Sequence, residues 1–308
     1  MIKDILFLNY HWVPNSTFIF KSLENTGYDC DFIGEPKLES FVPSCEYKVV
    51  IAYLHDPHHL PIISRLLETS LQNSFFIQHD DTDSEDVSRW FSRSPDLIMH
   101  RELTSNTNRH YNCPIYPMHF PIPSVNDYLN RERDVDVCFI GAPTNQRRNF
   151  FVDKLVQIQP QLNINWAIKY SHERNIPETL DILNRSKIVV NYPGNSYDSW
   201  RIWEAASAGA AILQPKLPLD SISKGHMFFD EYVEYNMDCS DLKDKIVWLL
   251  EEERWREWGS RSLNSYETYH TPEDCFVQYY NNIIRHVPLQ RLAPIPVNPF
   301  EIFKPNRV

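Results

Sequence analysis

The sequence predicts an α/β protein made of two successive domains, each a doubly wound parallel sheet covered by helices. Short apolar runs rich in β-branched residues alternate along the chain with segments of helical periodicity. Some runs, such as YKVVIAYL at 47–54, are uninterrupted, which is typical of strands buried on both faces of a parallel sheet. The alternation restarts at RERDVDVCFIG, residues 131–141, and 308 residues are enough for two domains.

The first domain, residues 1–125, is expected to hold the first series of elements. Its clearest helix is LPIISRLLETSLQ, residues 60–72, whose leucines and isoleucines recur at helical spacing. The run at 112–124 contains four prolines, which predicts a strand at a sheet edge that leads into a connection. The other strands are expected at 4–10, 28–34, 47–54, 74–81 and 95–101, with helices near 16–26 and 84–93.

The second domain, residues 126–286, repeats the pattern and is followed by a proline-rich tail at 287–308. Gly209 is expected to close a helix that begins between Ser196 and Ser199, before the strand AAILQP. Tryptophans 248, 255 and 258 have helical spacing, and we expect them to pack rather than to bind sugar. Strands are expected at 131–141, 162–170 and 186–193, and helices at about 147–158, 177–185, 241–266 and 272–286.

Composition narrows the possible functions. The net charge is −11 and no Lys/Arg-rich run is present, which disfavours duplex DNA as a partner while leaving room for one basic cleft. No apolar run reaches the ~18 residues of a transmembrane helix, and the start of the chain does not resemble a signal peptide. Six scattered cysteines then indicate reduced thiols in a cytoplasmic protein. No metal site is expected, because the His and Asp residues at 55–59 are too close in sequence to converge.

The stretch YDSWRIWEAASAGAAIL, residues 197–213, is the most informative part of the chain. It follows a predicted strand, and in doubly wound sheets ligands bind at the carboxyl ends of the strands. The helix is expected to begin within the segment from Ser196 to Ser199. The backbone N–H groups at its start have no partner within the helix, and they suit a phosphate. Arg201 lies in the first turn, where a cation is unfavourable by roughly 0.3–1 kcal/mol unless an anion is bound nearby. Glu204, one turn further on, could reach ribose hydroxyls.

The same two residues would also form an ordinary i,i+3 ion pair on the helix surface. This stretch alone leaves both interpretations open.

Three segments resemble a known family. Residues 186–213 resemble the donor-site segment of GT-B glycosyltransferases, in particular the CgeB/YkvP-like group related to glycosyltransferase family 4. Residues 134–150, DVDVCFIGAPTNQRRNF, resemble the opening of that group's nucleotide-binding domain, and FFIQHDD at 75–81 is a weaker match. The first match is carried by Ser186, Asn191, Arg201, Glu204, Ala205, Gly209 and Leu213.

The resemblance implies a GT-B fold, with two facing Rossmann-like domains and a cleft between them. It also implies a glycosyltransferase that moves a sugar from a nucleotide-sugar donor, bound by the second domain, to a hydroxyl acceptor. Such an enzyme is expected to be retaining and to need no metal or other cofactor. The acceptor is left open among a glycan, a lipid-linked sugar, a protein and a modified nucleobase.

The same resemblance suggests roles for individual residues. Glu204 matches the glutamate that binds the ribose, and Arg147 or Arg148 matches the basic residue at the diphosphate, with Arg148 also expected to act in catalysis. Lys169 matches a second basic residue, an ordinary surface lysine being the alternative. The remaining candidates are His79 and Asp80 on the acceptor side, Tyr192 near the base, and Ser196, Ser199 and Arg201 at the phosphates.

One departure from the family keeps other functions open. Family 4 enzymes have a second glutamate eight residues before the ribose glutamate, and here that position is Ser196. A GT-B protein that only binds or has a structural role is therefore an alternative, as is a sugar-nucleotide epimerase.

Overall fold

The chain forms two compact units, each with its own parallel sheet. One unit comprises Met1–Pro121 with Pro272–Val308, and the other comprises Ile122–Thr271. This architecture confirms the predicted α/β class. The computed structural model describes residues 2–9, 27–54, 59–80, 90–100, 113, 115–117, 132–172, 175–195, 197, 199–218 and 231–275.

The first unit contains a six-stranded sheet with the order β2-β1-β3-β4-β5-β6 and only parallel neighbours. The central strands are buried on both faces, since four consecutive residues from Ile5 to Leu8 have no exposed surface. β6 lies at the edge, as its prolines predicted. The strands are β1 Ile2–Asn9, β2 Cys30–Ile33, β3 Glu46–Leu54, β4 Phe75–Asp80, β5 Leu97–His100 and β6 Ile115–Pro117, and the helices are α2 Glu35–Leu38 and α3 Leu60–Glu68.

Helix α3 packs on one face of this sheet through the residues that gave it helical periodicity. Ile63, Leu66 and Leu67 are buried in one cluster with strand residues such as Val50 and Phe76. The helix ends at Glu68, four residues earlier than predicted. The helix expected near 84–93 is not formed at residues 90–93, and the rest of it, like the helix near 16–26, lies outside the described residues.

The second unit contains a five-stranded parallel sheet with the order β11-β10-β9-β7-β8. The chain runs from β7 to β8 on one side and then returns to β9 on the other, so the switch point lies between β7 and β9. Its strands are β7 Val135–Gly141, β8 Trp166–Tyr170, β9 Ser186–Val190, β10 Ala211–Pro215 and β11 Val233–Tyr235.

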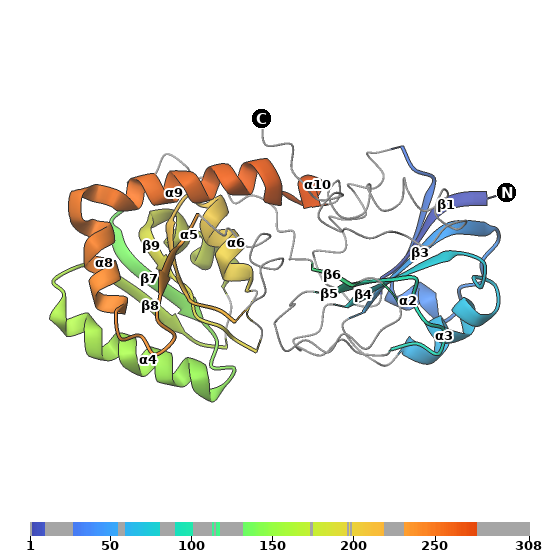
Figure 1. Ribbon diagram of the computed structural model, residues 1–308, viewed down its shortest axis with the longest axis horizontal. Coiled ribbons are helices and arrows are strands. Elements are labelled where there is room, and N and C mark those ends of the chain that lie inside the picture. The colour runs from blue at the N-terminus through green and yellow to red at the C-terminus, as the bar shows by residue number, and fades with distance from the viewer. Residues whose placement is uncertain are drawn as a thin grey trace. The chain divides into compact units, whose positions relative to one another are not determined.

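Helices cover both faces of this second sheet (Figure 1). Helices α4 (Gln146–Ile158) and α8 (Leu242–Leu250) share a buried cluster with Val137, Ile188 and Leu213 on one face. Helices α5 (Ile176–Arg185), α6 (Trp200–Ser207) and α9 (Arg254–Ser265) contact the strands from the other face. The described part of the chain ends in a π-helical turn, Tyr266–His270, and in α10, Pro272–Cys275.

The single helix predicted at 241–266 is wrong. Helix α8 ends at Leu250, a short turn follows at Glu251–Glu253, and α9 begins at Arg254. Glu252 and Glu253 have positive φ angles of 52° and 53°. The break lets α8 and α9 cover opposite faces of the sheet, and no glycine or proline marks it in the sequence.

Two glycines allow α9 to approach the sheet closely. Gly209 closes α6 as predicted, with a φ of +67° that favours glycine. Gly259 in α9 lies directly against it, because a β-carbon at this position would collide with the carbonyl oxygen of Gly209. Trp255 is buried in the core cluster that α4 and α8 also join, and Trp248 and Trp258 pack edge to face at 6.3 Å.

None of the described helices is long and apolar enough to cross a membrane. The proline-rich tail at 287–308 and most of the helix predicted at 272–286 lie outside the described residues.

Candidate functional site

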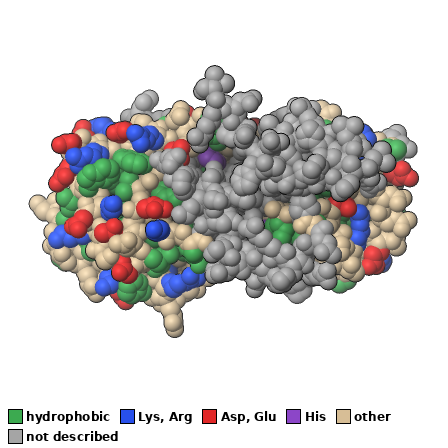
Figure 2. Space-filling view, in the orientation of Figure 1, with side chains coloured by type: hydrophobic (Ala, Val, Ile, Leu, Met, Phe, Trp, Pro, Cys, Tyr) green, Lys and Arg blue, Asp and Glu red, His purple; other side chains and the backbone are tan. Residues whose placement is uncertain are grey.

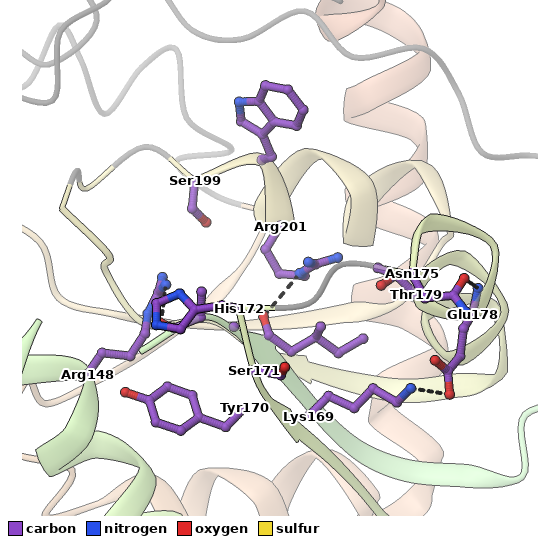
Figure 3. Close-up of a pocket in the computed structure, with 14 residues that line it drawn as sticks. Arg148, Lys169, Tyr170, Ser171, His172, Asn175, Glu178, Thr179, Ser199 and Arg201 are labelled. Atoms are coloured by element: carbon purple, nitrogen blue, oxygen red, sulfur yellow. Dashed lines mark hydrogen bonds and ion pairs between the residues drawn. The ribbon is translucent and has the colours of Figure 1, made fainter. Parts of the chain in front are cut away.

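A cavity of about 580 Å³ opens in the second unit at the carboxyl ends of β7 and β8. It lies beside the switch point of the sheet, where ligands of doubly wound proteins bind. The cavity is lined by the ends of these two strands, by the beginnings of α5 and α6, and by Arg148 from α4 (Figure 3).

Arg148 is fixed by the loops that follow β7 and β9. Its Nη1 donates to the carbonyl oxygen of Ala142 at 3.2 Å and its Nη2 donates to that of Tyr192 at 2.9 Å. Asn145 caps α4 by accepting the backbone N–H of Arg148 at 2.9 Å, and its amide donates to the carbonyl oxygen of Gly194 at 2.5 Å. The guanidinium therefore has one defined position at the cavity wall.

The charge of Arg148 is not neutralised by any carboxylate among the described residues. Within the described part of the chain, its side chain has no acidic partner and its Nε has no hydrogen-bond partner, and the residue is 9% exposed. Burial lowers the pKa of Arg148, and the neighbouring charge of Arg201 lowers it further. A buried cation without a counter-ion is expensive, which indicates that an anionic ligand belongs beside it.

Several other arginines in the described part of the second unit do not share this situation. Arg185 pairs with Asp134 at 2.5 Å, Arg256 pairs with Glu253 and Arg261 pairs with Glu257, and Figure 2 shows acidic and basic side chains interspersed over much of the described surface. Arg133 donates to two carbonyl oxygens, and one of them belongs to Ala208 at the C-terminal end of α6, where the helix dipole favours a cation. Arg148 lies instead in the first turn of α4, where the dipole disfavours one.

Arg201 brings a second cation to the cavity from the first turn of α6. Its Nε donates to the carbonyl oxygen of Ile140 at 3.3 Å, and its Nη1 forms an ion pair with Glu204. Both interpretations of this segment therefore hold in part, because the local ion pair forms and Arg201 also lines the cavity. Glu204 is 5% exposed and lies behind Arg201, outside the set of lining residues.

Lys169 lies at the end of β8 and also lines the cavity. It forms an ion pair with Glu178 in the first turn of α5, and both side chains are more than one-third exposed. An exposed pair of this kind contributes little to stability, roughly 0–1 kcal/mol, so a ligand can displace it. The charge of Lys169 is therefore available to an anion.

Two further candidates lie away from the cavity lining. The ring of Tyr192 stacks on Phe151 in the core at 4.5 Å, and only its carbonyl oxygen contributes to the site, as the acceptor of Arg148. Arg147 is exposed, and its guanidinium lies 5.9 Å from the ring centroid of Tyr197. Ser199 lines the cavity at the start of α6, whereas Ser196 lies outside the described residues.

His79 and Asp80 lie in the first unit, at the carboxyl end of β4. His79 is buried against Tyr53, with ring centroids 4.2 Å apart, and burial lowers its pKa to about 3. Asp80 lies opposite His100 in the sheet register, and its carboxylate is 3.5 Å from Nδ1 of that buried histidine. The sequence analysis did not single out His100.

Several other residues of the cavity, among them Ser171, His172 and Asn175, were not predicted from the sequence. The signal that could have found them is their position, since they follow directly on the predicted strand ending at Tyr170 and precede a helix.

Among the described residues, no group of three or more His, Cys, Asp or Glu side chains is placed to hold a metal ion.

Solved structures with a similar fold are glycosyltransferases and related enzymes. Sucrose-phosphate synthase from Thermosynechococcus elongatus has a TM-score of 0.62 at 10% identity, covering 93% of this chain and 99% of that chain. HepE from Anabaena, solved with UDP and glucose, has a TM-score of 0.53 at 12% identity, covering 91% and 99%. The pneumococcal O-GlcNAc transferase GtfA, solved with UDP and GlcNAc, has a TM-score of 0.53 at 10% identity, covering 78% and 57%. The protein therefore has the GT-B fold.

Residues 136–280, which contain the whole cavity, match the model of a family described as Glycosyl transferase-like. The second unit thus carries a glycosyltransferase-like domain. The chain spans only 57% of the length of GtfA. No curated protein matches the sequence.

Proposed function

We propose that this protein is a glycosyltransferase that takes its sugar from a nucleoside-diphosphate sugar and passes it to a hydroxyl acceptor. The observation that carries the proposal is the pair of arginines, the buried Arg148 and the partly buried Arg201, which line one cavity at the switch point. The glycosyltransferase-like match over 136–280 supports the reaction class, and the UDP complexes of HepE and GtfA support a diphosphate ligand.

The chemistry follows from the charge of the leaving group. When the bond between sugar and diphosphate breaks, negative charge grows on the diphosphate, and fixed cations stabilise it. Arg148 would act from the α4 side, and Arg201 together with the N-terminus of α6 would act from the other. Lys169 would exchange Glu178 for a phosphate oxygen. These groups supply the required positive charge without a metal ion, so we propose a metal-independent reaction.

Binding of the donor would also rearrange the Arg201–Glu204 pair. A diphosphate attracts the Arg201 guanidinium more strongly than one carboxylate does, because it offers several charged oxygens. Glu204 would then accept ribose hydroxyls, as the family resemblance implies. Arg147 would support the donor, and His79 and Asp80 would serve the acceptor. Retention of configuration, the CgeB/YkvP-like subgroup and a cytoplasmic location are further parts of the proposal.

The test is to incubate the protein with a panel of nucleotide sugars and to measure both binding and slow release of free sugar. We expect UDP or another nucleoside diphosphate to bind, and one donor to be hydrolysed in the absence of an acceptor. Arg148→Met should abolish both, whereas the matched control Arg185→Met, which removes an exposed arginine paired with Asp134, should change neither. Binding without sugar release would indicate a binding protein, and conversion of the donor to its epimer would indicate an epimerase. Failure of every nucleoside diphosphate to bind would refute the proposal.

A further inference from the structure

A buried pair of amides lies beneath the start of α6. The side-chain amide of Asn191, just after β9, donates to Oε1 of Gln214 in β10 at 2.6 Å, and the two residues are 2% and 1% exposed. The backbone of Asn191 is also fixed, because its N–H donates to the carbonyl oxygen of Leu213 and its carbonyl oxygen accepts the hydroxyl of Tyr235 at 2.6 Å. These bonds fix the orientation of the side-chain oxygen of Asn191, Oδ1.

That oxygen binds the hydroxyl of Ser199. The Ser199 hydroxyl donates to Oδ1 of Asn191 at 2.9 Å. Ser199 is the N-cap residue of α6 and has the extended backbone, with φ −114° and ψ 142°, from which serine usually caps a helix. Its side chain nevertheless makes no capping hydrogen bond. The amide pair thus holds the hydroxyl away from the backbone N–H groups of the first turn.

A second observation indicates what these N–H groups are kept for. The start of α6 opens into the cavity lined by Arg148, whose buried Nε has no partner among the described residues, and by Arg201 (Figure 3). The N–H of Ile202 donates to the carbonyl oxygen of Ser199 at 3.1 Å, so a serine cap or a ligand would take the N–H of Arg201. This N–H, the positive end of the helix dipole and two guanidinium groups all favour an anion at the same place. A capping serine would occupy the position that a phosphate oxygen needs.

We infer that Asn191, supported by Gln214, is a positioning residue that keeps Ser199 from capping α6, so that a phosphate of the donor takes the place of the cap. The inference rests on the proposed function. It assigns a role to Asn191, a residue of the family pattern that has no part in the proposed reaction.

The experiment removes both amides together. In the variant Asn191→Leu/Gln214→Leu, Ser199 loses its partner and can turn to cap the helix. Replacing both members of a buried polar pair by apolar groups is less disruptive than replacing one, and Nε2 of Gln214 already lacks a partner among the described residues. We expect UDP and inorganic pyrophosphate to bind about tenfold more weakly, which corresponds to about 1.4 kcal/mol.

Removing the serine hydroxyl should then reverse the loss. Adding Ser199→Ala to the double variant is expected to restore both affinities to within about threefold of the wild type. The matched control is Asn184→Leu, which removes another buried amide from the far end of α5 and should leave binding unchanged.

Each outcome bears on the inference. Wild-type affinity in the double variant, or a triple variant as weak as the double one, would overturn it, because a merely structural role of the amides is not rescued by Ser199→Ala. If the wild type binds neither probe, the proposed function itself fails. Should the double variant not fold, Ser199→Asn tests the same idea with the amides intact, since asparagine is a strong cap. Its affinity for UDP should fall about tenfold, and an unchanged affinity would overturn the inference.

Discussion

Replacing Gly194 by alanine should weaken both the fold and diphosphate binding, because this glycine leaves the space that Arg148 occupies. A β-carbon at position 194 would lie 3.0 Å from Nη2 and 3.2 Å from Cζ and Nη1 of the guanidinium. The guanidinium would have to move by a few tenths of an ångström. It is held on two sides by the carbonyl oxygens of Tyr192 and Ala142, so the movement stretches at least one of these hydrogen bonds.

The size of the effect follows from the bond that is strained. A hydrogen bond from a charged donor contributes roughly 1.5–3 kcal/mol, and a stretched one retains part of this. We therefore expect the free energy of unfolding to fall by about 1–2 kcal/mol, measured by urea denaturation. Displacement of the charge that faces the cavity should weaken UDP binding about tenfold, measured by calorimetry.

A double-mutant cycle with Arg148→Met tests the reasoning, since the two sites should be coupled. In the Arg148→Met background there is no guanidinium group for the new β-carbon to displace. Gly194→Ala should then lower the free energy of unfolding by less than about 0.5 kcal/mol. An equal loss of stability in both backgrounds would show that the alanine acts on the loop itself, and the explanation through Arg148 would be refuted. Wild-type UDP affinity in Gly194→Ala would refute it as well.

Three other changes test separate parts of the structure. Glu178→Gln should tighten UDP binding a few-fold in calorimetry at low salt, because it frees Lys169, and the gain should shrink as salt screens the charges; weaker binding would contradict this. Burial lowers the pKa of His79 to about 3, so the unfolded chain takes up a proton below about pH 6.5 that the folded chain does not. The free energy of unfolding should therefore fall by about 1 kcal/mol between pH 7 and pH 5.5 in urea denaturation, and it should fall by less in His79→Gln over the same interval. Gly259→Ala should destabilise by about 2–3 kcal/mol in the same assay, because its β-carbon meets the Gly209 carbonyl oxygen, and a neutral effect would show that α9 can move away.

The sequence predicted most of the sheet and much of the helical layer. Strands such as β1 and β3 were visible because of their apolar runs, ILFL and VVIAYL, which burial on both faces favours. The break between α8 and α9 was not visible, since two glutamates adopt the left-handed conformation there in a segment that is amphipathic throughout. The requirement to cover both faces of the sheet is a property of the whole unit and leaves no local signal.

The candidate site was predicted at the level of segments and less well at the level of side chains. Arg147 and Arg148 are adjacent in sequence, and only the direction of the helix makes one exposed and the other part of the cavity wall. The resemblance suggested Tyr192 near a base, yet its ring turns into the core while its carbonyl oxygen accepts a hydrogen bond from Arg148. Such choices depend on packing partners that are distant in sequence.

The net charge of −11 also gave no indication of an anion site, and the reason is physical. Exposed charges are screened over about 10 Å in 0.1 M salt, and many of those in the second unit are already paired. Arg148 is buried and Arg201 is partly buried, which reduces their screening by salt, and both lie in the first turns of helices whose dipoles add to their positive charge. The local potential in the cavity therefore depends on a few lining residues and two helix ends, and the net charge of the chain does not reveal it.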